Sequence, residues 1–212
     1  MGFGLLFIGY FIAYLGAFLP QISLFTYVLG SGVILFSLRK LIYENKLFIS
    51  SAIVAIALEL LSIISLGINV FTGGRGTFAF VLVYFVEISA YAFNILIMLS
   101  IHKLAKDVEL PKLSIMTLIN VGFISVGFIF FVLTEAITNP NVLLWLTPIY
   151  VVLKIAYSLF SLVLIFNSYM RICYEGDEKM QKETTGIKLF DKLNSLTNKA
   201  YSFKKNDKGG KK

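Results

Sequence analysis

The chain lacks the residues on which many catalytic and metal centres depend. Its 212 residues include one cysteine and one histidine, which excludes an intrachain disulfide and a site with several histidine ligands. No metalloprotease, serine-hydrolase, P-loop or dinucleotide-binding motif occurs. His102 falls at the end of an apolar segment, where we expect a solvated side chain. We therefore predict a protein that is not an enzyme and that uses no metal or cofactor.

Charge is missing from the first part of the chain. Residues 3–38 contain no Asp, Glu, Lys or Arg, and one helix of that length would measure roughly 54 Å, too long for a single membrane span. Pro20 lies near the middle, where it would interrupt a helix. We expect two short helices, at about 3–19 and 22–38. A re-entrant hairpin is the alternative, and either arrangement returns Arg39 to the side of the N-terminus.

Apolar residues, by contrast, are in excess. They make up 58% of the chain, with a mean hydropathy of +0.83, whereas soluble domains are about 45–50% apolar. Four further runs are each long enough to cross a bilayer, which takes about 20 residues. They lie at about 47–70, 77–101, 113–137 and 143–170. The pattern predicts an all-α polytopic transmembrane bundle of about six helices, or of four helices and an N-terminal hairpin.

Basic residues are distributed unevenly among the predicted loops. With an even number of crossings, three basic groups fall on the side of the N-terminus, and the other side has Arg75 alone. Those groups are Arg39, Lys40 and Lys46, then Lys103, Lys106 and Lys112, then Arg171 with the tail. Because Lys and Arg collect in cytoplasmic loops, we expect a multi-pass cell-membrane protein with both ends in the cytoplasm.

The chain divides into a membrane domain, residues 1–172, and a basic tail, residues 173–212. From Arg171 to the end there are 11 Lys and Arg against 6 Asp and Glu. Residues 187–203 form an amphipathic pattern typical of a helix at a membrane surface, with Lys188, Lys192 and Lys199 near anionic headgroups. Docking on the protein's own loops is the alternative. We expect the bilayer and its anionic inner-leaflet lipids as partners, and no nucleic acid.

Three ionisable residues are predicted near the middle of the bilayer: Glu59, Glu87 and Lys154. A charge at this depth costs roughly 2.5–3.5 kcal/mol, so the three should face protein or water and find one another. Lys154 can neutralise one acid, and the other must be protonated, hydrogen-bonded or solvated. Polar neighbours share their helix faces. Tyr91 and Asn94 follow Glu87, Ser62 follows Glu59, and Thr147, Tyr150, Tyr157, Ser158 and Ser161 flank Lys154. Glu135, near a helix end, is expected to be solvated.

Small residues recur at four-residue spacing in the first helix, at Gly9, Ala13 and Ala17. This pattern lets helices approach closely. We expect packing within the chain, and the alternative is a docking face for a partner membrane protein or a second copy.

Two resemblances follow from these segments. MGFGLLFIGYF at the start and YEGDE after the last span resemble small, uncharacterised integral membrane proteins of Gram-positive, clostridia-like bacteria, which implies no activity and no functional residues. Six helices with Gly9, Ala13 and Ala17 are also similar to the substrate-binding subunits of energy-coupling-factor vitamin transporters. That family has a longer first outer loop, whereas this chain has little beyond Pro20-Gln21.

Two functions fit these observations. The first is a small transporter or transport-associated subunit with a Glu59, Glu87 and Lys154 site, linked to proton movement. The second is a membrane interaction or organising protein in which these charges are structural and the tail binds the inner leaflet or a partner.

Overall fold

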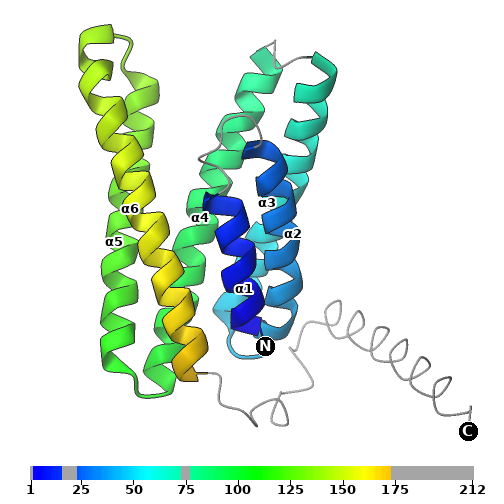
Figure 1. Cartoon of the computed structure of the whole chain (residues 1–212), viewed down its shortest axis with the longest axis vertical. Helices are drawn as coiled ribbons and strands as arrows, with labels where there is room; N and C mark the ends of the chain where they lie inside the picture. Colours follow the sequence, from blue (N-terminus) through cyan, green and yellow to red (C-terminus); the bar gives the residue numbers. More distant parts are fainter. Residues whose placement is uncertain (1, 16–22, 73–76, 173–212) are drawn as a thin grey trace, which may run out of the picture.

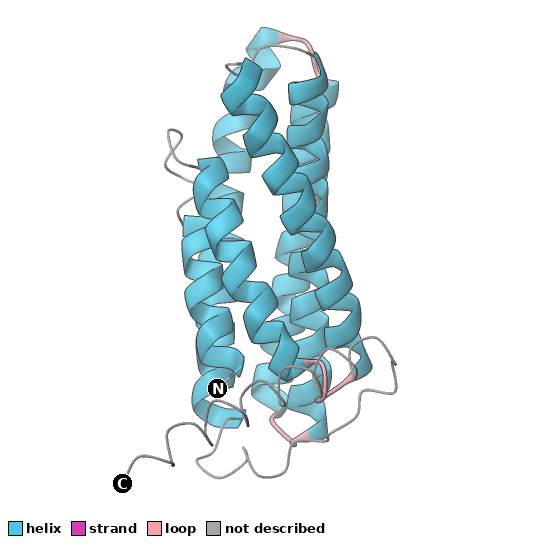
Figure 2. Cartoon of the chain, turned by 90° about the vertical axis from the view of Figure 1, so that its right-hand side faces the viewer, coloured by secondary structure: helices cyan, strands magenta, loops and turns pink. Residues whose placement is uncertain are grey.

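A computed structural model describes residues 2–15, 23–72 and 77–172, and this part of the chain is helical without strands. The helices are α1 (Gly2–Tyr10), a π-helical turn η1 (Phe11–Leu15), α2 (Ser23–Leu41), α3 (Lys46–Thr72), α4 (Thr77–Asp107), α5 (Pro111–Ala136) and α6 (Pro140–Ile172). They run side by side along the long axis (Figure 1, Figure 2). Five of them, α2 to α6, are long and apolar enough to cross a membrane. The predicted all-α membrane bundle is therefore confirmed.

The helix boundaries follow local chemistry. The side-chain oxygen of Asn45 accepts hydrogen bonds from the backbone N–H groups of Leu47 and Phe48, at 2.9 and 3.2 Å, and so caps α3. Pro111 and Pro140 stand at the first positions of α5 and α6, where a missing N–H costs nothing. Beyond α4, Glu109 has φ 57° and the Leu110 N–H bonds the Ala105 carbonyl at 2.8 Å, which is a Schellman ending.

Two predicted segments differ from the structure. Helix α4 continues six residues beyond the predicted end at 101, to Asp107, because its last turns leave the apolar zone without a breaker. The described part of the first helix, Gly2–Leu15, is a short apolar segment outside the five candidate spans. The predicted turn at Pro20, the small residue Ala17, the loop residue Arg75 and the tail, including the helix at 187–203 with Lys188, Lys192 and Lys199, lie outside the described residues.

The two ends of the bundle differ in charge. The N-terminus, the C-terminal ends of α2, α4 and α6 and the starts of α3 and α5 gather at one end (Figure 1), which we call the basic end. It holds Arg39, Lys40, Lys46, Lys103, Lys106, Lys112 and Arg171. The connections from α3 to α4 and from α5 to α6 lie at the other end, which we call the opposite end.

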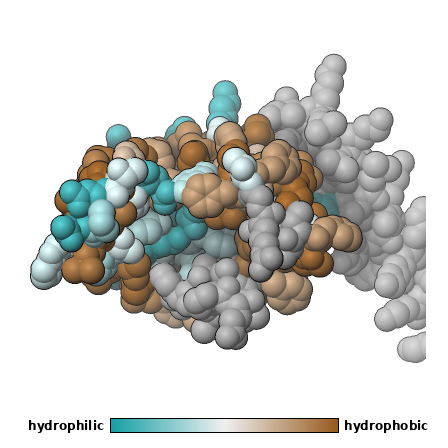
Figure 3. All heavy atoms as spheres, turned by 90° about the horizontal axis from the view of Figure 1, so that it is seen from above, coloured by the Kyte–Doolittle hydropathy of each residue, from teal (hydrophilic) through white to brown (hydrophobic). Residues whose placement is uncertain are grey.

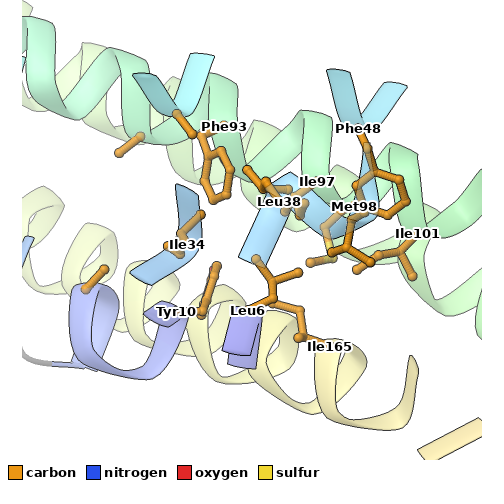
Figure 4. Close-up of a cluster of buried hydrophobic side chains, with 14 of the residues drawn as sticks. Leu6, Tyr10, Ile34, Leu38, Phe48, Phe93, Ile97, Met98, Ile101 and Ile165 are labelled. Carbon is orange, nitrogen blue, oxygen red and sulfur yellow. The ribbon is translucent and has the colours of Figure 1, made fainter. Parts of the chain in front are cut away.

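An apolar plug fills the bundle toward the basic end. It consists of side chains from α1, α2, α3, α4 and α6, none more than 1% exposed (Figure 4). Its members are Leu6, Ile34, Leu38, Phe48, Ile97, Met98, Ile101 and Ile165. Large apolar side chains also cover the outside of the helices, and Phe71 and Trp145 are 91% and 74% exposed. Such an outer surface is suited to lipid.

Candidate functional site in the membrane interior

Glu87 and Lys154 form an ion pair between α4 and α6. The Lys154 Nζ atom lies 2.8 Å from Oε1 and 2.9 Å from Oε2 of Glu87. The two side chains keep 16% and 19% of their surface exposed, and the ammonium lies 5.8 Å from the centre of the Tyr150 ring. α4 and α6 run in the same direction, and the pair lies about 15 Å along α4 and about 21 Å along α6 from the opposite end. It is a deep ion pair that is not fully sealed.

Glu59 has a different partner. Ser31 of α2 lies within hydrogen-bond distance of its Oε2 atom, and its Oε1 atom lies beside Gly32. Glu59 therefore contacts α2, whereas Glu87 is bonded to α6. The single three-residue cluster expected from the sequence is divided between two helix pairs. Ser31 was not singled out as a binding residue, because the sequence of residues 3–38 carries no charge to indicate one.

Near the opposite end, the Tyr84 hydroxyl donates a hydrogen bond to Oε2 of Glu135 and joins α4 to α5. Glu135 is exposed, as expected for a residue at a helix end, but it is also bonded. The Tyr84 ring contacts Phe131, with ring centres 6.0 Å apart. Phe131 in turn contacts the rings of Tyr91 and Tyr150, at 5.8 and 6.0 Å. These aromatic contacts connect the opposite end to the ion pair.

Further polar side chains continue from the ion pair toward the basic end. Asn94 is seven residues beyond Glu87, and Ser158 is four beyond Lys154, about 10 and 6 Å deeper along their helices. Asn94 is fully buried and Ser158 is 2% exposed. We call Tyr84, Glu135, Glu87, Lys154, Asn94 and Ser158 the polar column. Seen from the opposite end, hydrophilic side chains lie between hydrophobic groups near the middle of the molecule (Figure 3).

Several polar atoms around the deep part of the column have no hydrogen-bond partner among the described residues. They are the Asn94 amide oxygen and nitrogen, the Ser158 hydroxyl, and the hydroxyls of Tyr10 and Tyr27. Each unpaired buried polar group costs about 1–3 kcal/mol. A protein interior accepts that cost at several neighbouring positions when water or a polar ligand satisfies the groups.

The column ends in a hydrogen bond and then in the apolar plug. The Asn120 amide of α5 donates to the Ser161 hydroxyl of α6 at 2.7 Å, and both side chains are fully buried. Ile97 on α4 and Ile165 on α6 follow toward the basic end (Figure 4). The polar column thus reaches from the opposite end to about the middle of the bundle. Beyond it lies the apolar plug, beside which the buried Ser51 and Ser100 hydroxyls of α3 and α4 share a hydrogen bond of 3.1 Å.

The small residues of the first helix serve packing inside the chain. A Cβ atom on Gly30 of α2 would lie 2.4 Å from the backbone nitrogen of Ala13, and one on Gly9 would lie 2.8 Å from the Ile34 nitrogen. The face formed by Gly9 and Ala13 is therefore covered by α2. Packing within the chain, the first of the two expectations, applies to these two positions.

His102 is not the solvated residue that the sequence suggested. Its side chain is half-buried, and its Nδ1 atom lies 2.9 Å from both the hydroxyl and the carbonyl oxygen of Ser114 on α5. The extension of α4 past residue 101 brings it beside α5. The bond makes His102 a link between two helices at the basic end.

Comparisons with known protein families, with curated proteins and with solved structures found no match to this chain. In the part of the chain that the structure describes, no group of three or more Asp, Glu, His or Cys side chains is placed to hold a metal ion.

Proposed function

We propose that the protein is a small membrane transporter or a transport subunit, and that the polar column is its solute path. The observation that carries this proposal is the gradient of exposure along the column. Glu135 is exposed, Glu87 and Lys154 keep 19% and 16% exposure, and Asn94 has none. In alternating access, each state of a transporter is open to one side of the membrane and closed to the other. A polar column that is exposed at one end and ends in an apolar plug fits one such state.

The chemistry of the column fits a polar solute. Ion pairs inside membranes commonly mark substrate or ion pathways, and this pair has an exposed edge. Deeper in the column, the buried Asn94 amide and Ser158 hydroxyl supply further donors and acceptors. In this proposal water or solute satisfies them, which offsets the cost of burying them.

Basic residues support an orientation. We place the basic end in the cytoplasm of a cell-membrane protein, because seven lysines and arginines gather there. Lys112 and Arg171 also line a cavity of about 240 Å³ with Leu110, Pro111 and Leu113. A cavity with cationic and apolar walls suits the phosphate and glycerol of an anionic inner-leaflet lipid.

Water access tests the proposal directly. Cys173→Ser gives a cysteine-free chain. Single cysteines are then introduced one at a time: Ser158→Cys in the polar column, Ile97→Cys in the apolar plug, and Ile155→Cys on the exposed face of α6. A charged, membrane-impermeant thiosulfonate is added to either side of oriented proteoliposomes. We expect Ser158→Cys to react from the opposite end, and the other two to react from neither side. The experiment is repeated in the presence of cationic, anionic or zwitterionic amino acids. The charge class that protects Ser158→Cys from modification would identify the class of solute.

The competing function is an organising protein in which the ion pair only pins α4 to α6. The bonded geometry of Lys154 and Glu87 is compatible with that role. It predicts that Ser158→Cys is unreactive from both sides and with every solute, a result that would overturn the transporter proposal. Deletion of residues 187–212 would then be the informative variant, with loss of partner co-purification as the readout.

A further inference from the structure

Ser31 lies among three oxygen atoms. Its Oγ atom is 2.5 Å from the Tyr27 carbonyl oxygen and 3.3 Å from the Val28 carbonyl oxygen. Its third neighbour is Oε2 of Glu59. Ser31 is 1% exposed, whereas the Glu59 side chain is partly exposed.

A serine hydroxyl has one hydrogen to donate and lone pairs to accept with. The two carbonyl oxygens can only accept. If Glu59 were ionised, all three neighbours of Ser31 would be acceptors competing for one hydrogen. At least one close oxygen pair would then have no hydrogen between them, next to a full negative charge. If Glu59 carries a proton, its O–H donates to Ser31 Oγ while the Ser31 hydrogen points to the Tyr27 carbonyl.

We infer that Glu59 is a proton-binding site, held as a neutral carboxylic acid that donates to Ser31. This identifies which of the two deep acids is left without a cation. The inference does not depend on the polar column conducting a solute, because Glu59 contacts α2.

The charged surroundings agree with this assignment. The deep cation Lys154 is bonded to both oxygens of Glu87. On α4, the other helix packed against α3, the ionisable residues of the apolar part are Tyr84, Glu87 and Tyr91, none of them cationic. On α2, the atoms facing the carboxyl group belong to Ser31 and Gly32. With Glu87 and Lys154 cancelling, a protonated Glu59 makes the sum of these deep charges zero, as a low-dielectric interior favours.

Two measurements on the full chain in lipid test the inference. Dicyclohexylcarbodiimide, an apolar reagent, adds to protonated carboxyl groups, and peptide mass spectrometry locates the adduct. We expect at least about tenfold more adduct on Glu59 than on Glu87 at neutral pH, since both oxygens of Glu87 already accept hydrogen bonds from the Lys154 ammonium. Infrared spectroscopy should show a carboxylic-acid carbonyl band that Glu59→Gln removes and Glu135→Gln leaves in place. Ser31→Ala should shift this band by removing the hydrogen-bond acceptor.

The inference is overturned if the band is absent from the wild type at neutral pH, if it survives Glu59→Gln, or if the carbodiimide marks Glu87 first. Labelling of the wild type needs no variant, so a Glu59→Gln chain that fails to fold leaves a decisive experiment. The Ser158→Cys accessibility result is separate, and either proposal can fail while the other holds.

Discussion

Toward the opposite end, α4 and α6 meet through an ion pair and tyrosine rings, whereas toward the basic end α1 lies against α6 and the buried isoleucine, leucine and methionine side chains of the apolar plug fill the bundle (Figure 4). Helix α6 shows the change most clearly. All of its buried side chains, from Tyr157 to Ser168, lie in the half nearer the basic end. Over the other half, residues such as Leu144 and Val152 are 71% and 65% exposed.

The short first helix accounts for this difference within the described residues. Phe7 and Gly4 of α1 contact Phe166 and Tyr169 of α6, so α1 covers the half of α6 toward the basic end. Lipid is as apolar as leucine, so helices in a bilayer gain little from burying apolar surface against each other. The plug must therefore be held by close packing, and the polar column by directional bonds. Substitutions that remove a partner should damage the column most, and substitutions that change volume should damage the plug most.

Breaking the ion pair should have the largest effect. Lys154→Met leaves the Glu87 carboxylate unpaired inside the bundle, and we expect a loss of about 3–5 kcal/mol in the free energy of unfolding. SDS-induced unfolding, followed by circular dichroism in mixed micelles, measures the change. The matched control is Lys154→Met combined with Glu87→Gln, which removes both charges and should recover most of the stability. A single variant as stable as the wild type would show that the pair is solvated enough to be dispensable.

Forcing α1 away from α2 should have the second-largest effect on stability. Gly30→Ala places a methyl group 2.4 Å from the Ala13 nitrogen, and a backbone atom cannot move aside as a side chain can. We expect a loss of about 3 kcal/mol, at the upper end for overpacking. Gly122→Ala is the control because a Cβ there meets nothing within 4 Å, so it should be neutral or slightly stabilising. Equal effects of the two substitutions in the same unfolding assay would contradict the close α1–α2 contact.

Truncating a side chain of the apolar plug should have the third-largest effect on stability. It should also change the access of water-soluble reagents to the polar column. Ile97→Ala removes fully buried volume and should cost about 2 kcal/mol, the low end for such changes, since lipid supplies no hydrophobic gain. Ile88→Ala, on the 43% exposed face of the same helix, should stay within about 0.5 kcal/mol of the wild type. In the cysteine-free chain, Ile97→Ala should also let the thiosulfonate reach Ser158→Cys from the basic end. A plug that stays closed in this variant would mean that other side chains seal it.

Much of the fold was predictable, because each helix carries its own signal. Apolar runs of about 20 or more residues, broken by charged turns, predicted the long helices to within a few residues at most ends. The extension of α4 to Asp107 was missed because charged residues can continue a helix as readily as they can form a loop. The π-helical turn at Phe11–Leu15 has no signal in a uniformly apolar segment.

The site was predictable in its parts but not in its pairing. Depth along each helix indicated that Glu59, Glu87 and Lys154 lie near one level, and residue spacing gave the face of each helix. Whether Lys154 pairs with Glu59 or with Glu87 depends on which helix is the neighbour of α6. Helix order within the bundle is a tertiary property that residue spacing does not encode. For the same reason the sequence did not predict Ser31 as the partner of Glu59, or the bond between His102 and Ser114.

The smallest expected effect is at the entrance of the column. Tyr84→Phe keeps the ring against Phe80 and Phe131 but removes the hydrogen bond to Glu135, which should cost about 1 kcal/mol. Because that bond joins α4 to α5 where the column opens, its loss should also speed the modification of Ser158→Cys from the opposite end. A double-mutant cycle with Glu135→Gln separates the coupling from the single effects. A faster reaction without a matching change from the basic end would mean that the two halves open independently, whereas an equal increase from both ends would mean that the column and the plug move as one unit.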